Sequence, residues 1–147
     1  MLVLIVGQGP SASSEGLPPF DPSTYSGRKL CELAGVERAE ELGVVVNLLD
    51  RYPGRSRKGS KGDHFFAWKA RQIAKKTPLH RFDRVVLVGR NVARSFGVGD
   101  RPFLRWFEHR GTKVSIVPHP SGVNHWWNDP RNVRRARRFV RRLAPAA

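Results

Sequence analysis

The sequence has only one cysteine, Cys31, among its 147 residues. A single cysteine excludes a disulfide framework, an iron–sulfur cluster and any metal site built from several thiolates. Cys31 falls on the apolar face of a predicted helix, which is typical of a buried core thiol. We therefore expect no cofactor and no metal. A chain of this length predicts one domain over residues 1–147, and we expect it to be a monomer.

Long hydrophobic runs are also absent. No apolar stretch approaches the roughly 20 residues that a helix needs to cross a bilayer. The apolar segment 1–6 lacks the basic flank and the cleavage site of a signal peptide, so it is interpreted as a strand. These absences predict a cytoplasmic protein that does not contact membranes.

Acidic residues are scarce: 12 Asp and Glu stand against 27 Lys and Arg, which gives a formal net charge of +15. Such an excess indicates a polyanionic partner, with nucleic acid favoured over an anionic membrane surface. Arginine outnumbers lysine, which favours bidentate contacts to phosphate. One basic cluster comprises Arg55, Arg57, Lys58 and Lys61. A second comprises Arg131, Arg134, Arg135, Arg137, Arg138, Arg141 and Arg142, and its alternative interpretation is a solvated helix face.

Four short runs rich in β-branched residues predict strands at 2–7, 43–48, 84–89 and 113–117. Helical patterns occur at 28–33, 63–76, 91–96, 102–110 and 129–143. Strands that alternate with helices predict an α/β fold with a parallel sheet and helices on both faces. Long loops at 11–26 and 51–62 follow the ends of two strands, where open α/β sheets bind their ligands.

The first predicted strand is followed by a turn of glycine, proline and small polar residues. A dinucleotide-binding fingerprint is excluded because no third glycine follows at the required spacing and no helix begins there. A Walker A motif is absent too. A simple tight turn remains the alternative to a binding loop. The turn consists of Gly7, Gln8, Gly9, Pro10 and Ser11.

Asn47 lies near the end of the second predicted strand, after three valines. Its amide offers one donor group and one acceptor, which suits the edge of a pyrimidine such as uracil. The alternative is a buried asparagine that is hydrogen-bonded to the backbone.

His119 follows the fourth predicted strand, in a loop constrained by two prolines. When a base leaves deoxyribose, negative charge develops on the base, and a neutral imidazole can stabilise it by donating a hydrogen bond. A surface histidine is the alternative. In the same loop, Ser121 and Gly122 can bind phosphates, and Val123 can insert into the space left by a flipped base.

These three elements resemble, in order, spacing and strand context, the motifs of the uracil-DNA glycosylase superfamily. Segments 85–93, 19–20 and 26–30 are similar to further elements of its bacterial, iron–sulfur-bearing branch. The resemblance implies a three-layer α/β/α sandwich around a four-stranded parallel sheet. It also implies hydrolysis of the N-glycosidic bond of a base flipped out of DNA.

The resemblance implies a role for each residue as well. Asn47 would recognise the base edge, His119 would stabilise the leaving base, and Phe20 would stack on the base, with Tyr25 as the competing stacking residue. Gln8 would face the attacking water. The base would be surrounded by Gly7, Gly9, Pro10, Ser11, Phe20 and Asn47, and the DNA would contact Ser121, Gly122 and Val123. Independently of the resemblance, loop position and positive charge predict that DNA also contacts Asn124, Arg55, Arg57, Lys58 and Lys61.

Three departures from the family pattern change the expectation. The cluster-binding cysteines are missing, so no iron–sulfur cluster is expected. The first motif has Gln8 and Gly9 where the family has Asp, Glu or Asn, and a glutamine can orient a water but cannot take its proton. Ser11 replaces the bulky Tyr of the most uracil-selective branch, which predicts that 5-substituted pyrimidines are admitted. The substitute bases on the neighbouring loops are Glu15, Asp50 and Asp63.

The expectation from sequence is therefore a DNA glycosylase acting on uracil or a 5-substituted pyrimidine. The alternatives are a catalytically attenuated DNA-binding module of the same fold and an enzyme of viral base hypermodification. Of the adjacent Trp126 and Trp127, we expect one to pack in the core and the other to lie near DNA.

Overall fold

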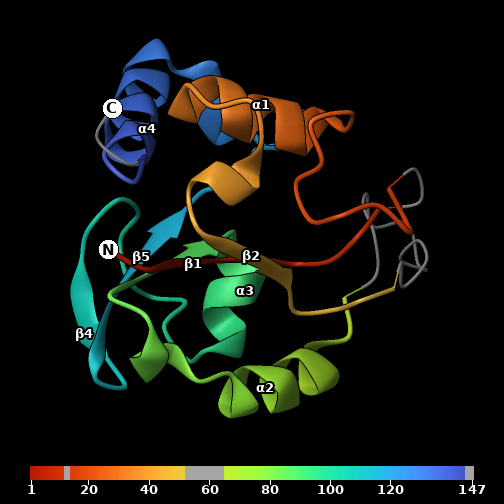
Figure 1. Cartoon of the computed structure of the whole chain (residues 1–147), viewed down its shortest axis with the longest axis vertical. Coiled ribbons are helices and arrows are strands. Elements are labelled where there is room, and N and C mark those ends of the chain that lie inside the picture. Colours follow the sequence, from red (N-terminus) through yellow and green to blue (C-terminus); the bar gives the residue numbers. More distant parts are fainter. Residues whose placement is uncertain (12–13, 52–64, 145–147) are drawn as a thin grey trace.

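The computed structural model describes residues 1–11, 14–51 and 65–144, which form an α/β fold around one sheet (Figure 1). The strand order is β2-β1-β3-β5-β4. Four strands are parallel, namely β1 (Val3–Gly7), β2 (Val44–Asn47), β3 (Arg84–Val88) and β5 (Thr112–Val117). The α/β class is confirmed. The predicted number of four strands is wrong, because β4 (Phe107–His109) adds a fifth strand antiparallel to β5.

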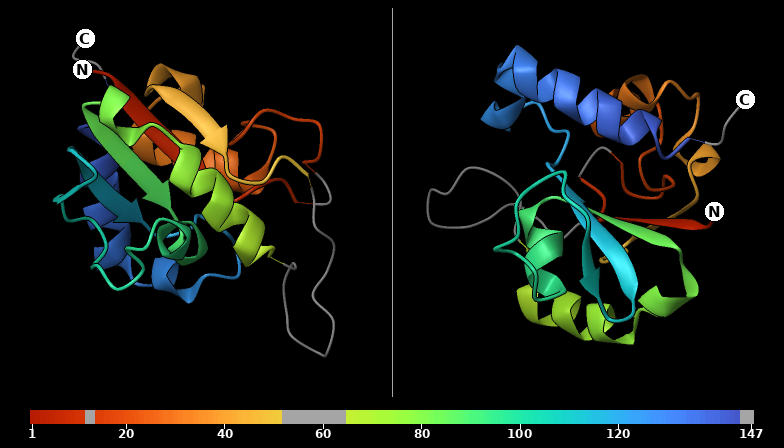
Figure 2. Two further views of the ribbon diagram at one scale, coloured as in Figure 1. Left: turned by 90° about the horizontal axis from the view of Figure 1, so that it is seen from below. Right: turned by 90° about the vertical axis from the view of Figure 1, so that its left-hand side faces the viewer.

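Helices cover both faces of this sheet (Figures 1 and 2). Helices α1 (Tyr25–Ala34) and α4 (Pro130–Arg141) lie on one face. Helices α2 (Ala67–Lys76) and α3 (Arg90–Ser95) lie on the other. Three short 3₁₀ helices, η1 (Ala39–Glu41), η2 (Leu79–Arg81) and η3 (His125–Asn128), complete the described elements. No helix of these described segments has the length and apolar character needed to cross a membrane.

Side chains of the central strands point alternately to the two faces of the sheet and contribute to a hydrophobic core on each face. In β1, Leu4 and Val6 pack into the core beneath α2 and α3, whereas Val3 and Ile5 pack into the core beneath α1 and α4. Successive strand residues point to opposite faces, so a strand covered on both sides is apolar throughout. For this reason, these strands occur in the sequence as continuous apolar runs. Cys31 is buried in the second core, at 5% exposure, as predicted.

The predicted helix at 102–110 does not form. Residues 107–109 of this segment form β4 instead. A two-residue turn joins β4 to β5, and His109 pairs with Thr112. Both turn residues have positive φ, 50° at Arg110 and 79° at Gly111. That conformation matches the twist of a hairpin and cannot continue a right-handed helix.

Two of the other helices, α1 and α4, begin at a side-chain cap. Thr24 accepts a hydrogen bond from the Gly27 amide at the start of α1. Asp129 accepts one from the Arg131 amide, with Pro130 as the first residue of α4. The helix predicted at 63–76 begins at Ala67, and its predicted cap, Asp63, lies outside the described residues.

Candidate functional site

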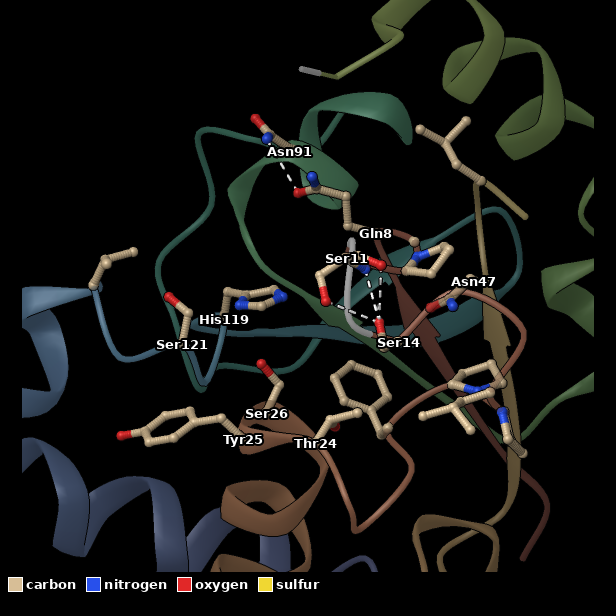
Figure 3. A pocket seen from close by; sticks show the side chains of 18 residues that line it. Gln8, Ser11, Ser14, Thr24, Tyr25, Ser26, Asn47, Asn91, His119 and Ser121 are labelled. Carbon is tan, nitrogen blue, oxygen red and sulfur yellow. Dashed lines mark hydrogen bonds between the residues drawn. The ribbon is translucent and has the colours of Figure 1, made fainter. Parts of the chain in front are cut away.

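A pocket of about 480 Å³ opens at the carboxyl edge of the sheet (Figure 3). The last residue of β2 and the segments that follow β1, β3 and β5 each contribute a polar side chain, and the loop before α1 forms another wall. A volume of this size is typical of small-molecule sites. Nine predicted site residues line the pocket: Gln8, Gly9, Pro10, Ser11, Phe20, Asn47, His119, Ser121 and Val123.

Gly7 supports the pocket rather than lining it. It pairs with Asn47 in the ladder between β1 and β2. A Cβ atom on residue 7 would lie 2.6 Å from Oδ1 of Asn47 and 2.8 Å from the ring of Phe20. Only glycine therefore lets the Asn47 amide and the Phe20 ring lie side by side over the end of β1.

The Asn47 side chain has no hydrogen bond to another described residue and faces the pocket. Because the residue is only partly buried, water can satisfy its amide until a ligand arrives. Both the donor and the acceptor of this amide are thus available to a bound molecule.

Phe20 has a left-handed backbone, with φ of 55°, which is unfavourable for a bulky residue. The segment around it is held by side-chain capping: Thr24 Oγ1 donates to the carbonyl of Asp21 at 2.7 Å and accepts from the Gly27 amide at 3.1 Å. A Cβ on Gly27 would lie 2.0 Å from that same carbonyl oxygen. The close packing of this loop against α1 fixes the Phe20 ring at the pocket.

His119 lies half-buried at the pocket wall. Neither ring nitrogen hydrogen-bonds to another described residue. Burial lowers the pKa of His119 below its ordinary value, since the charged imidazolium is disfavoured away from water. The ring is therefore neutral at pH 7, with one N–H donor and one acceptor.

The backbone of the His119 loop is fixed through one carbonyl. The carbonyl oxygen of His119 accepts from the Ser121 amide at 2.9 Å, from Asn124 Nδ2 at 3.0 Å and from Trp127 Nε1 at 2.8 Å. Asn124 Oδ1 also accepts from the Trp126 amide, so both ends of its side chain bond within the protein. Asn124 thus positions the loop.

Trp127 is the core member of the tryptophan pair, at 7% exposure. Trp126 is half-buried and meets the Trp127 ring edge-on, with centroids 4.8 Å apart. The expectation that one of the two rings packs in the core is confirmed.

A hydrogen-bond relay sets the orientation of Gln8. Arg94 Nη1 donates to Asn91 Oδ1 at 3.3 Å. Asn91 Nδ2 donates in turn to Gln8 Oε1 at 3.2 Å (Figure 3). Because a guanidinium has donors only, it directs the oxygen of Asn91 toward itself and the Asn91 amino group toward Gln8. Gln8 therefore presents its Nε2 donor, and not its oxygen, to the pocket.

Hydroxyl groups line much of the remaining wall. Ser14 Oγ accepts from the Ser11 amide at 2.8 Å and lies 3.0 Å from Ser11 Oγ. Ser11 and Tyr25 have site roles predicted from the sequence, but four other polar residues that line the pocket do not. They are Ser14 and Thr24 in the loop before α1, Ser26 in the first turn of α1 and Asn91 in the first turn of α3, directly after β3. Ser26 and Asn91 belong to the segments 26–30 and 85–93 noted above, whereas the only sequence signal at Ser14 and Thr24 is their place in a long loop.

Among the described residues that line the pocket, none is an aspartate or glutamate. Glu15 and Asp50, two of the three substitute bases, are exposed and do not line it. Asp63 lies outside the described residues, as does the basic cluster of Arg55, Arg57, Lys58 and Lys61. Gly122 is not among the residues that line the pocket; a Cβ built on it would lie 3.7 Å from Cζ of Tyr25, which does line it.

No group of three or more histidine, cysteine, aspartate or glutamate side chains among the described residues is close enough to hold a metal ion. Comparison with protein-family models and with curated proteins finds no match to this chain.

Proposed function

We propose that this protein is a DNA glycosylase that hydrolyses the N-glycosidic bond of uracil or of a 5-substituted pyrimidine flipped out of DNA. One observation carries the proposal: Asn47, Phe20 and a neutral His119, from three separate segments, line the same pocket. The proposed enzyme acts as a monomer in the cytoplasm.

Base recognition is assigned to Asn47 and Phe20. The amide of Asn47 donates to O4 of the pyrimidine and accepts from N3–H, which distinguishes uracil-type bases from cytosine. The Phe20 ring supplies an apolar face for stacking, a contact worth about 1–3 kcal/mol per base. The rigid loop around Phe20 means that little conformational freedom is lost on binding.

Bond cleavage is assigned to His119. As the bond between C1′ and the base nitrogen breaks, its electron pair passes to the base and the sugar gains oxocarbenium character. The imidazole N–H donates to O2 of the base and stabilises the developing anion. Water then adds its hydroxyl to C1′, and its proton is released to solvent or to the base. Because the bond breaks before water attacks, the reaction tolerates the absence of a strong base at Gln8.

DNA binding is assigned to the His119 loop and to the basic surface. Val123 is 85% exposed at the pocket mouth, where it can insert into the stack that the base leaves. The Ser121 hydroxyl and the Gly122 backbone bind the adjacent phosphates. The basic cluster of Arg55, Arg57, Lys58 and Lys61 belongs to this proposal as well.

The test is strand cleavage by alkali after incubation with labelled oligonucleotides that contain uracil, 5-hydroxymethyluracil, hypoxanthine, thymine or a modified cytosine. Cleavage that His119→Ala and Asn47→Ala abolish, with unchanged thermal unfolding, supports the proposal and identifies the base. A substrate cleaved equally by both variants would contradict the assigned roles. Exclusive cleavage of unsubstituted uracil would contradict the admission of 5-substituents.

A second candidate is a DNA-binding module that flips a base without removing it. The donor orientation of Gln8 and the carboxylate-free lining of the described pocket favour it, since neither helps to activate water. Salt-sensitive binding that depends on Asn47 and Phe20, with no cleavage of any modified oligonucleotide, would select this candidate.

A further inference from the structure

A second, smaller cavity lies in the groove between α1 and α4. Its volume is about 130 Å³. Leu33 of α1 and Val133 of α4 supply apolar wall, and three cations from the two helices surround it, Arg28, Lys29 and Arg137. We refer to it as the α1–α4 groove.

No ion pair between described residues neutralises the positive charge of this groove. Glu32 is the acidic residue among those that line it. The ion pair found in the described part of the chain, Arg131 with Asp129, involves none of these groups. Lys29 lies over the Trp127 ring, 5.0 Å from its centroid, which limits the freedom of its ammonium group. Three cations against one carboxylate make this concave surface a site for an anion.

The α1–α4 groove and the base pocket share Tyr25, which lines both cavities. The Tyr25 ring is half-exposed, and a Cβ placed on Gly122 would lie 3.7 Å from its Cζ atom. Figure 3 shows Tyr25 beside Ser26 at the edge of the pocket, on the side where α1 begins. A chain molecule that enters the pocket can therefore continue past Tyr25 into the groove.

We propose that the α1–α4 groove binds the phosphodiester backbone of the nucleic-acid strand whose nucleotide occupies the pocket. Arg28 and Arg137 bind phosphate oxygens, Lys29 adds a fixed positive charge, and Tyr25 contacts the sugar or base between the two cavities. The inference rests on the proposed nucleic-acid substrate but not on base removal, since a non-cleaving module would use the groove in the same way.

The experiment measures binding of unmodified, labelled single-stranded and duplex oligonucleotides by fluorescence anisotropy at several salt concentrations. Arg137→Gln and Arg28→Gln are compared with Arg138→Gln, which removes the same charge from an exposed position of α4 outside the groove. We expect the groove variants to lower affinity by about threefold or more and the salt slope by about 0.7 per phosphate contact on single strands. Arg138→Gln should change both quantities less.

A gain of affinity provides a readout that misfolding cannot produce. Glu32→Gln removes the acidic side chain of the groove and should strengthen binding. Glu40→Gln, on an exposed position of η1 outside the groove, is its control. Thermal unfolding verifies that all variants are folded.

Equal effects of Arg137→Gln and Arg138→Gln would overturn the groove, because they would indicate a general charge effect. Stronger dependence on Arg137 for anionic phospholipid vesicles than for DNA would overturn the nucleic-acid assignment. The glycosylase proposal is judged separately by base removal in His119→Ala. Loss of groove-dependent binding with base removal intact would reject the groove alone, and the reverse result would reject the glycosylase alone.

Discussion

Asn91 donates a hydrogen bond from Nδ2 to Oε1 of Gln8, and this bond determines what Gln8 offers to a ligand. Since Arg94 occupies the oxygen of Asn91, the Gln8 amide is turned with its donor toward the pocket. A donor there can bind a carbonyl or phosphate oxygen. It is poorly suited to accept a proton from water, which accords with a reaction in which the leaving base departs first.

Asn91→Asp should reverse the Gln8 amide. A carboxylate has acceptors only, so it would bond to Gln8 Nε2 and leave Gln8 Oε1 facing the pocket. We expect kcat/KM for the cleaved oligonucleotide to fall by about tenfold, a change of about 1.4 kcal/mol. In a Gln8→Leu background the same substitution should have little further effect, which a double-mutant cycle measures. Additive losses would contradict the relay.

Gly7→Ala should disturb the pocket floor. The new methyl group would lie 2.6 Å from Asn47 Oδ1, so the Asn47 amide or the Phe20 ring must move. We expect a loss of about 1–3 kcal/mol in unfolding free energy, measured by denaturant titration, together with weaker binding of the base. Gly122→Ala is the control for stability, since its added Cβ makes only ordinary contact at 3.7 Å. Equal stability losses would contradict the close packing at Gly7.

Asn124→Ala should loosen the His119 loop. It removes the hydrogen bond from Nδ2 to the His119 carbonyl and the cap on the Trp126 amide. We expect a loss of about 1–2 kcal/mol in unfolding free energy and a lower kcat. Asn128→Ala, on an exposed position of the same short helix, provides the comparison. Weaker DNA binding with unchanged stability and kcat would instead identify Asn124 as a direct DNA contact.

His119 should titrate below the ordinary histidine value of about 6.5, because burial disfavours its charged form. More than half of the rings are then still neutral at pH 6.5, so the rate should fall by less than half between pH 8 and 6.5 if the neutral donor is the active form. Below pH 6.5 the unfolded chain takes up the proton more readily than the folded one. The contribution of His119 to stability is therefore complete above that pH and is lost as the pH falls.

The measurement is the chemical shift of the His119 Hε1 proton against pH, assigned by comparison with His119→Gln. Unfolding midpoints of the two proteins at pH 7.5 and 5 test the stability statement. A titration midpoint above 6.5, or a stability difference that does not change with pH, would contradict it.

The parts of the site that the sequence could predict are those set by strand ends. Gln8, Asn47 and His119 each follow an apolar run, and parallel strands bring their carboxyl ends to one edge. Asn91 follows the third strand in the same way, but only the contacts with Gln8 and Arg94 reveal what it does. Side-chain partners across 83 positions of sequence leave no local pattern.

The error at 102–110 has a specific physical origin. Phe103, Leu104 and Phe107 have helix-like spacing, and Asp100 resembles a helix cap. Leu104 instead has a positive φ of 61°, and its amide donates to the carbonyl of Ile116. Tertiary pairing with β5 therefore overrides the local pattern. The glycine of the Arg110–Gly111 turn was the signal that a hairpin begins there.

Residues from the ends of four strands line one pocket, and this arrangement offers a way to identify the ligand. A molecule that touches both Asn47 and His119 spans the sheet from β2 across β1 and β3 to β5, joining residues 72 positions apart in the chain. Such a molecule binds only when the whole sheet is assembled, so its binding energy adds to the stability of the domain as RT ln(1 + [L]/Kd). Nucleobases, nucleosides and short modified oligonucleotides can therefore be ranked by the melting temperature that each produces, before any reaction is observed.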